Sequence, residues 1–476
     1  MIILTILLVF ITGLLLLWLF NQHKYLNIFE QLALGFWVVL SLFVFELFLE
    51  GIIFDKLSLI WPVLTFFVLV WILIFKNSKN KGLLSEILVS IKDNSLQIKS
   101  SFITLKSWQK IVSVLIVFYV IFKVFMAFSI NISMPTFDED SVAGWDLKTK
   151  VFVENKSLVL DRRNSEFLGS ALERNIFAPL TDTYFLFGYD KFPVGLSNII
   201  APLVYLCLIF LFFGIFIRKA NLFYSLISVY IFTSLPFIFI HSFWAYFNYI
   251  SGFFLFTFAF YLSDQVLNLE KDFKINFRIL VPLAISSFLD ASIRNESIML
   301  MLAIFFIEFG LFWFYNKKDF KFKKYLFVFW GLTWAFIAYL SNIYINYISP
   351  QKVGDVSSIV KWWVISNFFE SIWKPWVLSA PFIQSFYHTD YNLLYLLYFI
   401  AVIIFLFNFK KLLEIKSLFL SSVALLWIFG IILIINVELL WLLTHYAFVR
   451  YPIAIIPFLV YIVSYFIHFI FAKKWQ

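Results

Sequence analysis

Three acidic residues stand side by side at positions 138–140, directly after an apolar stretch that ends near residue 130. Ionised carboxylates are costly at the edge of a hydrocarbon layer unless water, cations or other partners surround them. A carboxylate there can take a proton from a hydroxyl group, and carboxylate oxygens can also hold a divalent cation. Asp138 and Asp140 are therefore candidates for acid–base chemistry or cation binding. The alternative is a hydrated helix end that only sets depth in a membrane.

The segments that must position these acids are strongly apolar. Of the 476 residues, 63% are hydrophobic and 14% are charged, whereas soluble domains carry roughly 25% charged residues. The apolar residues form blocks long enough to cross a bilayer, which takes roughly 20 residues. Within such a block only a helix satisfies its own backbone hydrogen bonds. We therefore expect an all-α fold, a polytopic transmembrane helix bundle. The single cysteine, Cys207, excludes an internal disulfide framework and a cysteine-based zinc site.

The lengths of the apolar blocks predict about thirteen membrane spans. They cover residues 1–20, 30–50, 57–75, 110–130, 193–217, 222–241, 248–263, 279–290, 297–315, 325–347, 391–408, 417–436 and 452–471. The first block lacks a basic start and an evident small-residue cleavage site, which favours a spanning helix over a signal peptide.

The basic residues fall in alternate connections between these spans, and this arrangement sets the orientation. They gather at residues 76–81, 218–219, 317–324, 410–411 and 473–474. The side that carries them is expected to be the cytoplasm, so the N-terminus lies outside and the C-terminus inside. We interpret the formal net charge of +9 as this topology and expect no nucleic-acid partner. Residues 82–109, which contain several lysines, predict an amphipathic helix on the inner leaflet against anionic membrane lipid.

Two long connections, residues 131–192 and 348–390, fall on the opposite side. The first is rich in acids, and the second is rich in aromatic residues that favour a membrane interface. Loops of this length in compact proteins are usually functional or disordered. Because polar and apolar residues alternate in both, we expect them to be ordered.

The run Asp140-Ser-Val-Ala-Gly-Trp145-Asp-Leu-Lys148-Thr-Lys resembles a motif of bacterial multi-spanning proteins in the C-type glycosyltransferase superfamily (GT-C). These proteins are relatives of the protein O-mannosyltransferases and the aminoarabinose transferases. In that group an aspartate after an early span is followed by a tryptophan and a Leu-Lys-x-Lys/Arg run. Further along, residues 190–193 resemble the family's aspartate, tyrosine and proline before the next span, with Asp190 as the aspartate and Phe192 in the tyrosine place.

Three weaker matches follow in the family's order. Residues 235–248 resemble a segment that usually ends in Asp, and because Asn248 stands in that place, a second acid in the site is in doubt. Arg294-Asn-Glu296 resembles a Lys/Arg-Asn-Glu turn, and Arg450 with Pro457 resembles an arginine and a proline at the last span. The ordered similarity covers residues 110–460. We therefore take residues 110–476 as a GT-C-like catalytic module, and residues 1–109 as an N-terminal segment of three spans plus the amphipathic helix.

The resemblance implies a glycosyltransferase of the hexosyltransferase type that moves a sugar from a polyprenyl-phosphate donor to a hydroxyl of a lipid, glycan or protein. The reaction would take place at the extracytoplasmic face of a bacterial plasma (inner) membrane. Asp140 would be the general base, with Asp138 as an alternate or a metal partner. No cofactor and no metal-ligand set are assigned, although a divalent cation could take part. Cations stabilise a leaving phosphate, and the residues expected to bind the donor phosphate or substrate are Lys148, Arg294, Glu296, Arg450, Trp145 and Asp190.

Structural explanations exist for the same residues. Arg450 could be an interfacial arginine whose head group reaches water, Arg294 and Glu296 could pair across a short turn, and Lys148 could contact lipid head groups. Other functions also remain open. An envelope glycan polymerase or ligase would use arginines in its outer loop. A transporter or flippase would favour charged residues near the bilayer midplane and two halves of the chain related by an internal repeat. A scaffold would not need the acids at 138–140.

Overall fold

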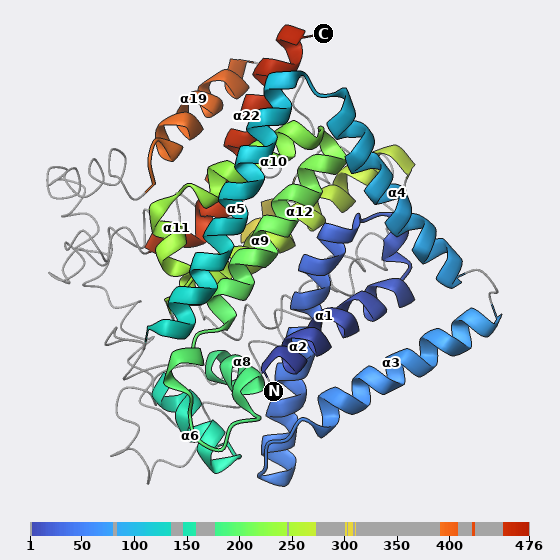
Figure 1. The fold of residues 1–476 in the computed structure, drawn as a ribbon, viewed down its shortest axis with the longest axis vertical. Helices are drawn as coiled ribbons and strands as arrows, with labels where there is room; N and C mark the ends of the chain where they lie inside the picture. Colours follow the sequence, from blue (N-terminus) through green and yellow to red (C-terminus); the bar gives the residue numbers. More distant parts are fainter. Residues whose placement is uncertain are drawn as a thin grey trace, which may run out of the picture. The chain divides into compact units, whose positions relative to one another are not determined.

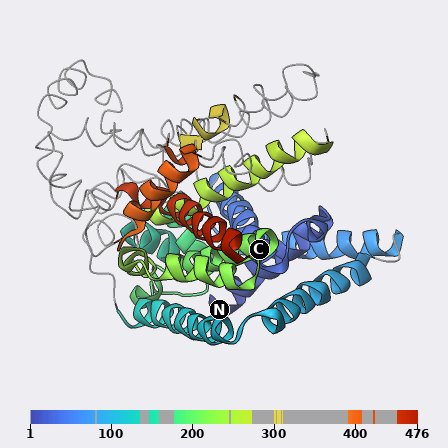
Figure 2. The same ribbon diagram turned by 90° about the horizontal axis from the view of Figure 1, so that it is seen from above.

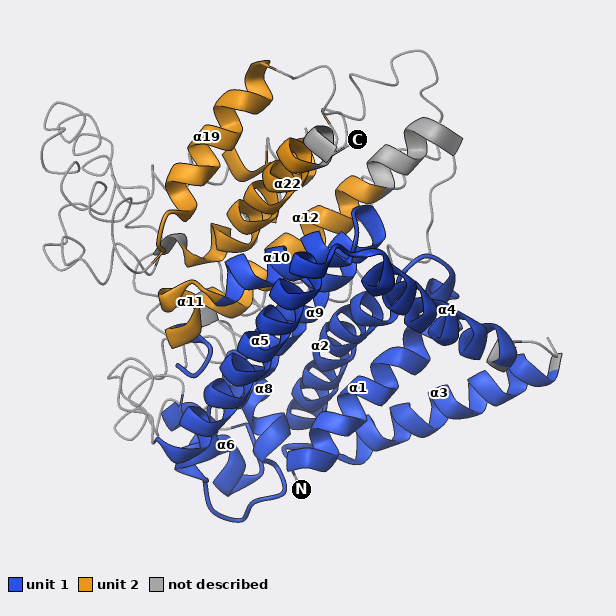
Figure 3. Ribbon diagram, turned by 45° about the horizontal axis from the view of Figure 1, so that its top comes forward, with its two compact units in different colours: residues 1–233, 241–246, 276–293 blue, residues 234–240, 247–275, 294–476 orange. Residues whose placement is uncertain are grey.

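A computed structural model describes residues 2–79, 83–134, 146–158, 177–244, 247–272, 391–407 and 451–475, together with residues 421–423 and parts of 300–310. These residues form helices and turns and contain no strand, which confirms the all-α expectation for the part of the chain they cover. The chain divides into two compact units, which are coloured separately in Figure 3. Unit 1 comprises residues 1–233, 241–246 and 276–293, and unit 2 comprises residues 234–240, 247–275 and 294–476.

Within the described residues, six helical segments are long and apolar enough to cross a membrane, and five of them belong to unit 1. These five lie at the positions of the expected spans at 1–20, 30–50, 57–75, 110–130 and 193–217, and confirm that these blocks are helical. They are α1 (Ile2–Leu19), α2 (Ile28–Phe54), α3 (Ile60–Lys79), α5 (Ser107–Ser133), and α9 (Ile200–Lys219) with the preceding 3-10 turn η5 (Val194–Leu196).

Burial separates the central helices of unit 1 from its peripheral ones. In α2, 72% of the most apolar stretch of 18 residues is buried, because α2 packs against both α1 and α9 (Figure 1). Only 11% of the corresponding stretch is buried in α3 and 17% in α5. Exposed apolar side chains on these two helices fit contact with lipid, since hydrocarbon is the solvent that such a surface requires.

The crossing of α1 and α2 depends on two glycines. A Cβ atom added to Gly13 would clash with the carbonyl carbon and oxygen of Gly35, so the two backbones touch at this point. Small residues at a helix–helix contact allow this close approach, which is common between membrane helices.

The helix connections of unit 1 gather at two opposite ends. At one end, the Lys76 ammonium donates hydrogen bonds to the Leu19 carbonyl (2.6 Å) and to Asn21 Oδ1 (3.0 Å), and α4 (Leu83–Thr104) also packs there. At the other end, the Leu57 amide donates a hydrogen bond to the Lys156 carbonyl. Of the amphipathic segment expected at 82–109, residues 83–104 form the helix α4, and α5 begins at Ser107. The helix α4 adjoins α3 at the edge of unit 1 (Figure 2), at the same end as the basic residues near 76–79 and 218–219.

The connection 131–192 contains helical structure where it is described. It holds α6 (Leu147–Asn155) and α8 (Phe177–Leu186), which pack against each other at the end of unit 1 opposite α4. Order is thus confirmed for residues 146–158 and 177–192. Residues 135–145 and 159–176 lie outside the described residues.

One expected span in this region is interrupted. Residues 222–241 were expected to form a single helix, but α10 (Leu222–Thr233) ends before Ser234 and a separate helix, α11, begins at Pro236 (Pro236–His241). Proline has no amide proton to donate, and it disfavours a helical conformation at the residue before it. The break therefore falls where the sequence places Leu235-Pro236.

Unit 2 contains α12 (Phe247–Asp272), α19 (Leu394–Phe407), the 3-10 turn η8 (Tyr451–Ile455) and α22 (Ile456–Trp475). α22 packs against both α12 and α19. These helices match the expected spans at 248–263, 391–408 and 452–471, although α12 continues to Asp272. The spans expected at 279–290 and 325–347 and the loop 348–390 lie outside the described residues, as do most of the spans at 297–315 and 417–436, so the total of about thirteen stays a prediction.

Candidate functional site

The α6–α8 pair is held on the ends of α1 and α2 by aromatic packing. The rings of Phe177 and Tyr184 lie 5.0 Å from Phe48 and 5.4 Å from Phe43, respectively, measured between ring centres. The Tyr184 hydroxyl also donates a hydrogen bond to the carbonyl of Thr5 (3.3 Å). Every residue of α8 is buried. A polar side chain on this helix is therefore removed from water and loses its hydration.

Lys148 is on the buried side of α6. It is 1% exposed and lies one helical turn before Phe152, which is fully buried, so the two share a face of the helix. Burial lowers the pKa of the Lys148 ammonium to about 7, because a charged group loses its hydration there. Lys150, two residues on, is exposed. This burial does not fit the alternative in which Lys148 contacts lipid head groups.

Two acids share this buried region. Asp146 is 5% exposed at the start of α6, and Asp182 is 1% exposed in the middle of α8. Neither carboxyl oxygen of Asp182 has a hydrogen-bond partner among the described residues. Burial, together with the nearby charge of Asp146, raises the pKa of Asp182 well above its ordinary value. Both effects favour the neutral acid, which can donate a hydrogen bond as well as accept one.

Hydrogen bonds fix the two helices relative to each other. The hydroxyl of Thr149 donates to the carbonyl of Pro179 across the helix pair (3.4 Å). The ammonium of Lys156, which follows α6 in a left-handed conformation (φ 53°), donates to the carbonyls of Phe187 (2.9 Å) and Tyr189 (2.8 Å) just after α8. Hydrogen bonds therefore connect α6 and α8 near both of their ends and hold the two helices in one relative position.

Asp190 lies away from this buried group. It is exposed in the turn after α8, and its charge acts on Lys156, whose pKa burial lowers and Asp190 partly restores. Of the residues predicted for the site, the structure therefore describes Lys148 as buried and Asp190 as exposed. The others lie outside the described residues, and they are Asp138, Asp140, Trp145, Arg294, Glu296 and Arg450. Asn248 is described only as part of the α12 backbone.

Asp146 and Asp182 are not among the site residues predicted from the sequence. Asp146 could have been predicted, because it stands two residues before Lys148 in the motif that carries the family resemblance. Asp182 had a weaker signal, as the only charged residue in the otherwise uncharged run from 177 to 186. Its burial depends on α1 and α2, which come from a distant part of the chain.

The α6–α8 pair offers an amine that can exchange a proton near neutral pH. An ammonium with a pKa of about 7 changes between the cation and the neutral amine near neutral pH. An arriving phosphate favours the cation, since an opposite charge raises the pKa of an amine. Within the described residues, no group of three or more His, Cys, Asp or Glu side chains could hold a metal ion.

Comparison with known proteins adds no relative. No protein-family model, no curated protein and no solved structure matches this chain.

Proposed function

We propose that this chain is a membrane glycosyltransferase of the GT-C type, transferring a sugar from a polyprenyl-phosphate donor to a hydroxyl of a lipid, glycan or protein. The proposal places the protein in a bacterial plasma (inner) membrane with its active site on the extracytoplasmic face. The observation that carries it is the burial of Lys148, the lysine of the motif that resembles the family's, within the α6–α8 pair. A motif lysine that served only lipid contact would be expected at the surface, as Lys150 is.

The chemistry requires a base, and the motif supplies one. Asp140 takes the proton of the acceptor hydroxyl as its oxygen attacks the anomeric carbon of the sugar. The bond between that carbon and the phosphate oxygen breaks, and polyprenyl phosphate leaves with the bonding electrons. Asp138 is the alternate base or a partner for a divalent cation.

Cations must stabilise the phosphate as its negative charge develops. Lys148 fits this role, because desolvation strengthens its attraction for an anion in a low-dielectric environment. Arg294 and Arg450 would add donors that bind phosphate in a bidentate way. Glu296, Trp145 and Asp190 complete the proposed substrate-binding set. The α6–α8 pair lies at the end of unit 1 opposite α4, and this arrangement supports a site away from the basic connections.

The test measures sugar transfer in detergent with a panel of polyprenyl-phosphate hexoses carrying a radioactive sugar. Wild-type protein should release polyprenyl phosphate from at least one donor, and Asp140→Asn should abolish the release. Glu154→Gln is the matched control, because Glu154 is an exposed acid on α6, and it should keep full activity. Both variants should unfold at the wild-type temperature.

Several outcomes would contradict the proposal. Full activity of Asp140→Asn would remove the assigned base. Consumption of polyprenyl-diphosphate glycans alone would indicate the polymerase or ligase instead. Movement of an intact donor across vesicles without bond cleavage would indicate a flippase.

A further inference from the structure

A polar cavity lies at the end of unit 1 opposite the α6–α8 pair. Its volume is about 740 Å³, and its walls are the turn η1 (Gln22–Lys24), residues 25–27, one face of α4 and the end of α9. Four charged side chains line it: Lys24, Glu86, Asp93 and Arg218. The proposed transfer reaction uses none of them, so the cavity has no role in the site described above.

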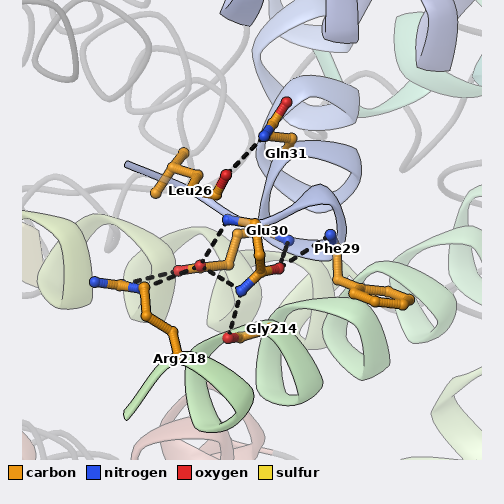
Figure 4. Close-up of polar contacts among 7 residues, drawn as sticks. Leu26, Phe29, Glu30, Gln31, Gly214 and Arg218 are labelled. Carbon is orange, nitrogen blue, oxygen red and sulfur yellow. Dashed lines mark hydrogen bonds and ion pairs between the residues drawn. The ribbon is translucent and has the colours of Figure 1, made fainter. Parts of the chain in front are cut away.

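Arg218, which lines the cavity, belongs to a network of hydrogen bonds with residues at the start of α2 (Figure 4). The Arg218 guanidinium donates to both carboxylate oxygens of Glu30, with distances of 3.1 Å from Nε and 2.9 Å from Nη2. The Asn27 side-chain amide donates to Glu30 (2.8 Å) and to the Gly214 carbonyl (2.7 Å), and Asn27 Oδ1 accepts the amide protons that start α2. Arg218 is therefore held in place before any ligand arrives, which lowers the entropic cost of binding.

A buried histidine, His23, faces the same cavity. Its side chain is 2% exposed, and neither ring nitrogen forms a hydrogen bond with another described residue. The nearest carboxylate oxygen, Oε2 of Glu86, is 3.7 Å from Nε2, beyond hydrogen-bonding range. A buried imidazole without a hydrogen-bond partner destabilises the fold. A ligand with donor or acceptor groups would supply the missing hydrogen bond.

The side chains that line the cavity carry charges of both signs, with the Arg218 guanidinium already paired with the buried Glu30 carboxylate behind it, and this mixture favours a ligand that also carries both signs. Lys24 and Arg218 contribute two positive charges, and Glu86 and Asp93 contribute two negative ones, with the Lys24 ammonium 2.8 Å from a Glu86 oxygen. A purely anionic ligand would meet both carboxylates, and a purely cationic ligand would meet both cations. A ligand with a phosphate and an amine close together can satisfy both signs at once.

The outer face of α4 indicates that the cavity lies at the level of lipid head groups. Leu88, Lys92, Leu96, Lys99 and Ile103 are all exposed, and their spacings of three or four residues put them on one side of the helix. Lysines between apolar side chains are typical of a helix that lies in a membrane interface. Glu86 and Asp93 line the cavity and fall outside this stripe.

We propose that this cavity binds the head group of a zwitterionic phospholipid that carries a primary amine, as phosphatidylethanolamine does. The phosphate lies near Lys24 and Arg218, and the ammonium lies near Glu86 and Asp93. His23 contributes a hydrogen bond to the head group. The acyl chains extend into the bilayer alongside α4.

The test uses full-length protein purified in detergent and compares four compounds by native mass spectrometry and thermal unfolding. They are phosphatidylethanolamine, phosphatidylcholine, phosphatidylglycerol and the soluble head-group compound glycerophosphoethanolamine. Phosphatidylethanolamine should bind about tenfold more tightly than either other lipid, the size expected for one charge-assisted hydrogen bond. Phosphatidylcholine lacks ammonium protons, and phosphatidylglycerol lacks the amine.

Two variants test the two halves of the head group. Asp93→Asn should remove the preference for phosphatidylethanolamine over phosphatidylcholine, and Lys24→Gln should weaken the binding of all three lipids. Asp55→Asn is the control, because Asp55 is exposed, lies outside the cavity and has a left-handed conformation (φ 49°) that asparagine also adopts. It should bind lipids as the wild type does.

Three results would overturn the proposal. Equal or tighter binding of phosphatidylglycerol would identify an anion site, and an unchanged lipid preference in Asp93→Asn would show that the cavity is not where the amine binds. Glycerophosphoethanolamine binding as tightly as the lipid would identify a site for a soluble metabolite. None of these results depends on sugar transfer.

Discussion

Replacing Lys148 with methionine should remove a pH dependence of stability that the wild-type protein shows between pH 7 and pH 10.5. Lys148 has an ordinary pKa of 10.5 in the unfolded chain and a pKa of about 7 in the fold. Between these values the unfolded chain holds a proton that the folded chain has released. Stability therefore rises with pH across this window, and it is constant below pH 7, where both states are protonated.

The size of the effect follows from the same two values. One pKa unit corresponds to about 1.4 kcal/mol, so the whole window is worth on the order of 4 to 5 kcal/mol for Lys148. The interval from pH 7 to pH 9 covers roughly 2 to 3 kcal/mol of it. Lys148 is almost fully buried, so screening by solvent reduces this figure little.

The assay is denaturant unfolding in detergent, followed by tryptophan fluorescence at several pH values from 6.5 to 9. The quantity of interest is the free energy of unfolding of the wild type minus that of Lys148→Met, which should grow by about 2 to 3 kcal/mol between pH 7 and pH 9. Lys150→Met is the matched control: Lys150 is exposed on the same helix, and its replacement should leave the wild-type pH dependence intact. Parallel curves for the wild type and Lys148→Met would refute the burial of this ammonium.

Three further predictions concern the stability of variants at other positions in unit 1. Arg218→Gln should cost about 2 to 4 kcal/mol of unfolding free energy, because it leaves Glu30 buried without its cation; the double variant with Glu30→Gln should cost less than the sum of the two single changes, and additive costs would contradict the pairing. Gly13→Ala should lower stability by about 1–3 kcal/mol through a backbone clash, whereas Gly310→Ala, which meets open space, should be nearly neutral in the same thermal assay. The wild type should lose stability relative to Asp182→Asn as pH rises above about 4, because the folded state keeps a proton that the unfolded state releases; a difference that stays constant from pH 4 to pH 7 would show that Asp182 is hydrated.

The membrane helices could be predicted from sequence because their signal is local. A block of roughly 20 apolar residues predicts a span without reference to the rest of the chain, and five helices of unit 1 that are long and apolar enough to cross a membrane lie where the blocks fall. The break at Pro236 also had a local signal, since proline cannot continue a helix from the preceding turn. The prediction of one continuous span at 222–241 missed this break because apolar residues continue on both sides of the proline.

The candidate site could be predicted only in part, because burial is not local. The motif pointed to Lys148, but neither the motif nor the charge pattern shows that α8 covers α6. Nor do they show that α8 rests on α1 and α2 through Phe48 and Tyr184. The first three spans carry no recognisable motif, yet two of them form the surface on which the α6–α8 pair is built. The burial of Asp182, and with it the raised pKa of its carboxyl group, follows from that packing.

The two ends of unit 1 differ in whether a buried carboxyl group has hydrogen-bond partners. At the α4 end, Glu30 is fully buried but receives two hydrogen bonds from Arg218, so the folded chain itself compensates the desolvation. At the α6–α8 end, Asp182 is equally buried and has no hydrogen-bond partner among the described residues. A chain selected for stability alone would favour an apolar residue there, since replacing buried polar groups with apolar ones is often neutral or stabilising. Retaining Asp182 near Asp146 is reasonable if a ligand supplies the missing interactions. The buried acid thus supports the proposed site at this end of unit 1, independently of the family resemblance.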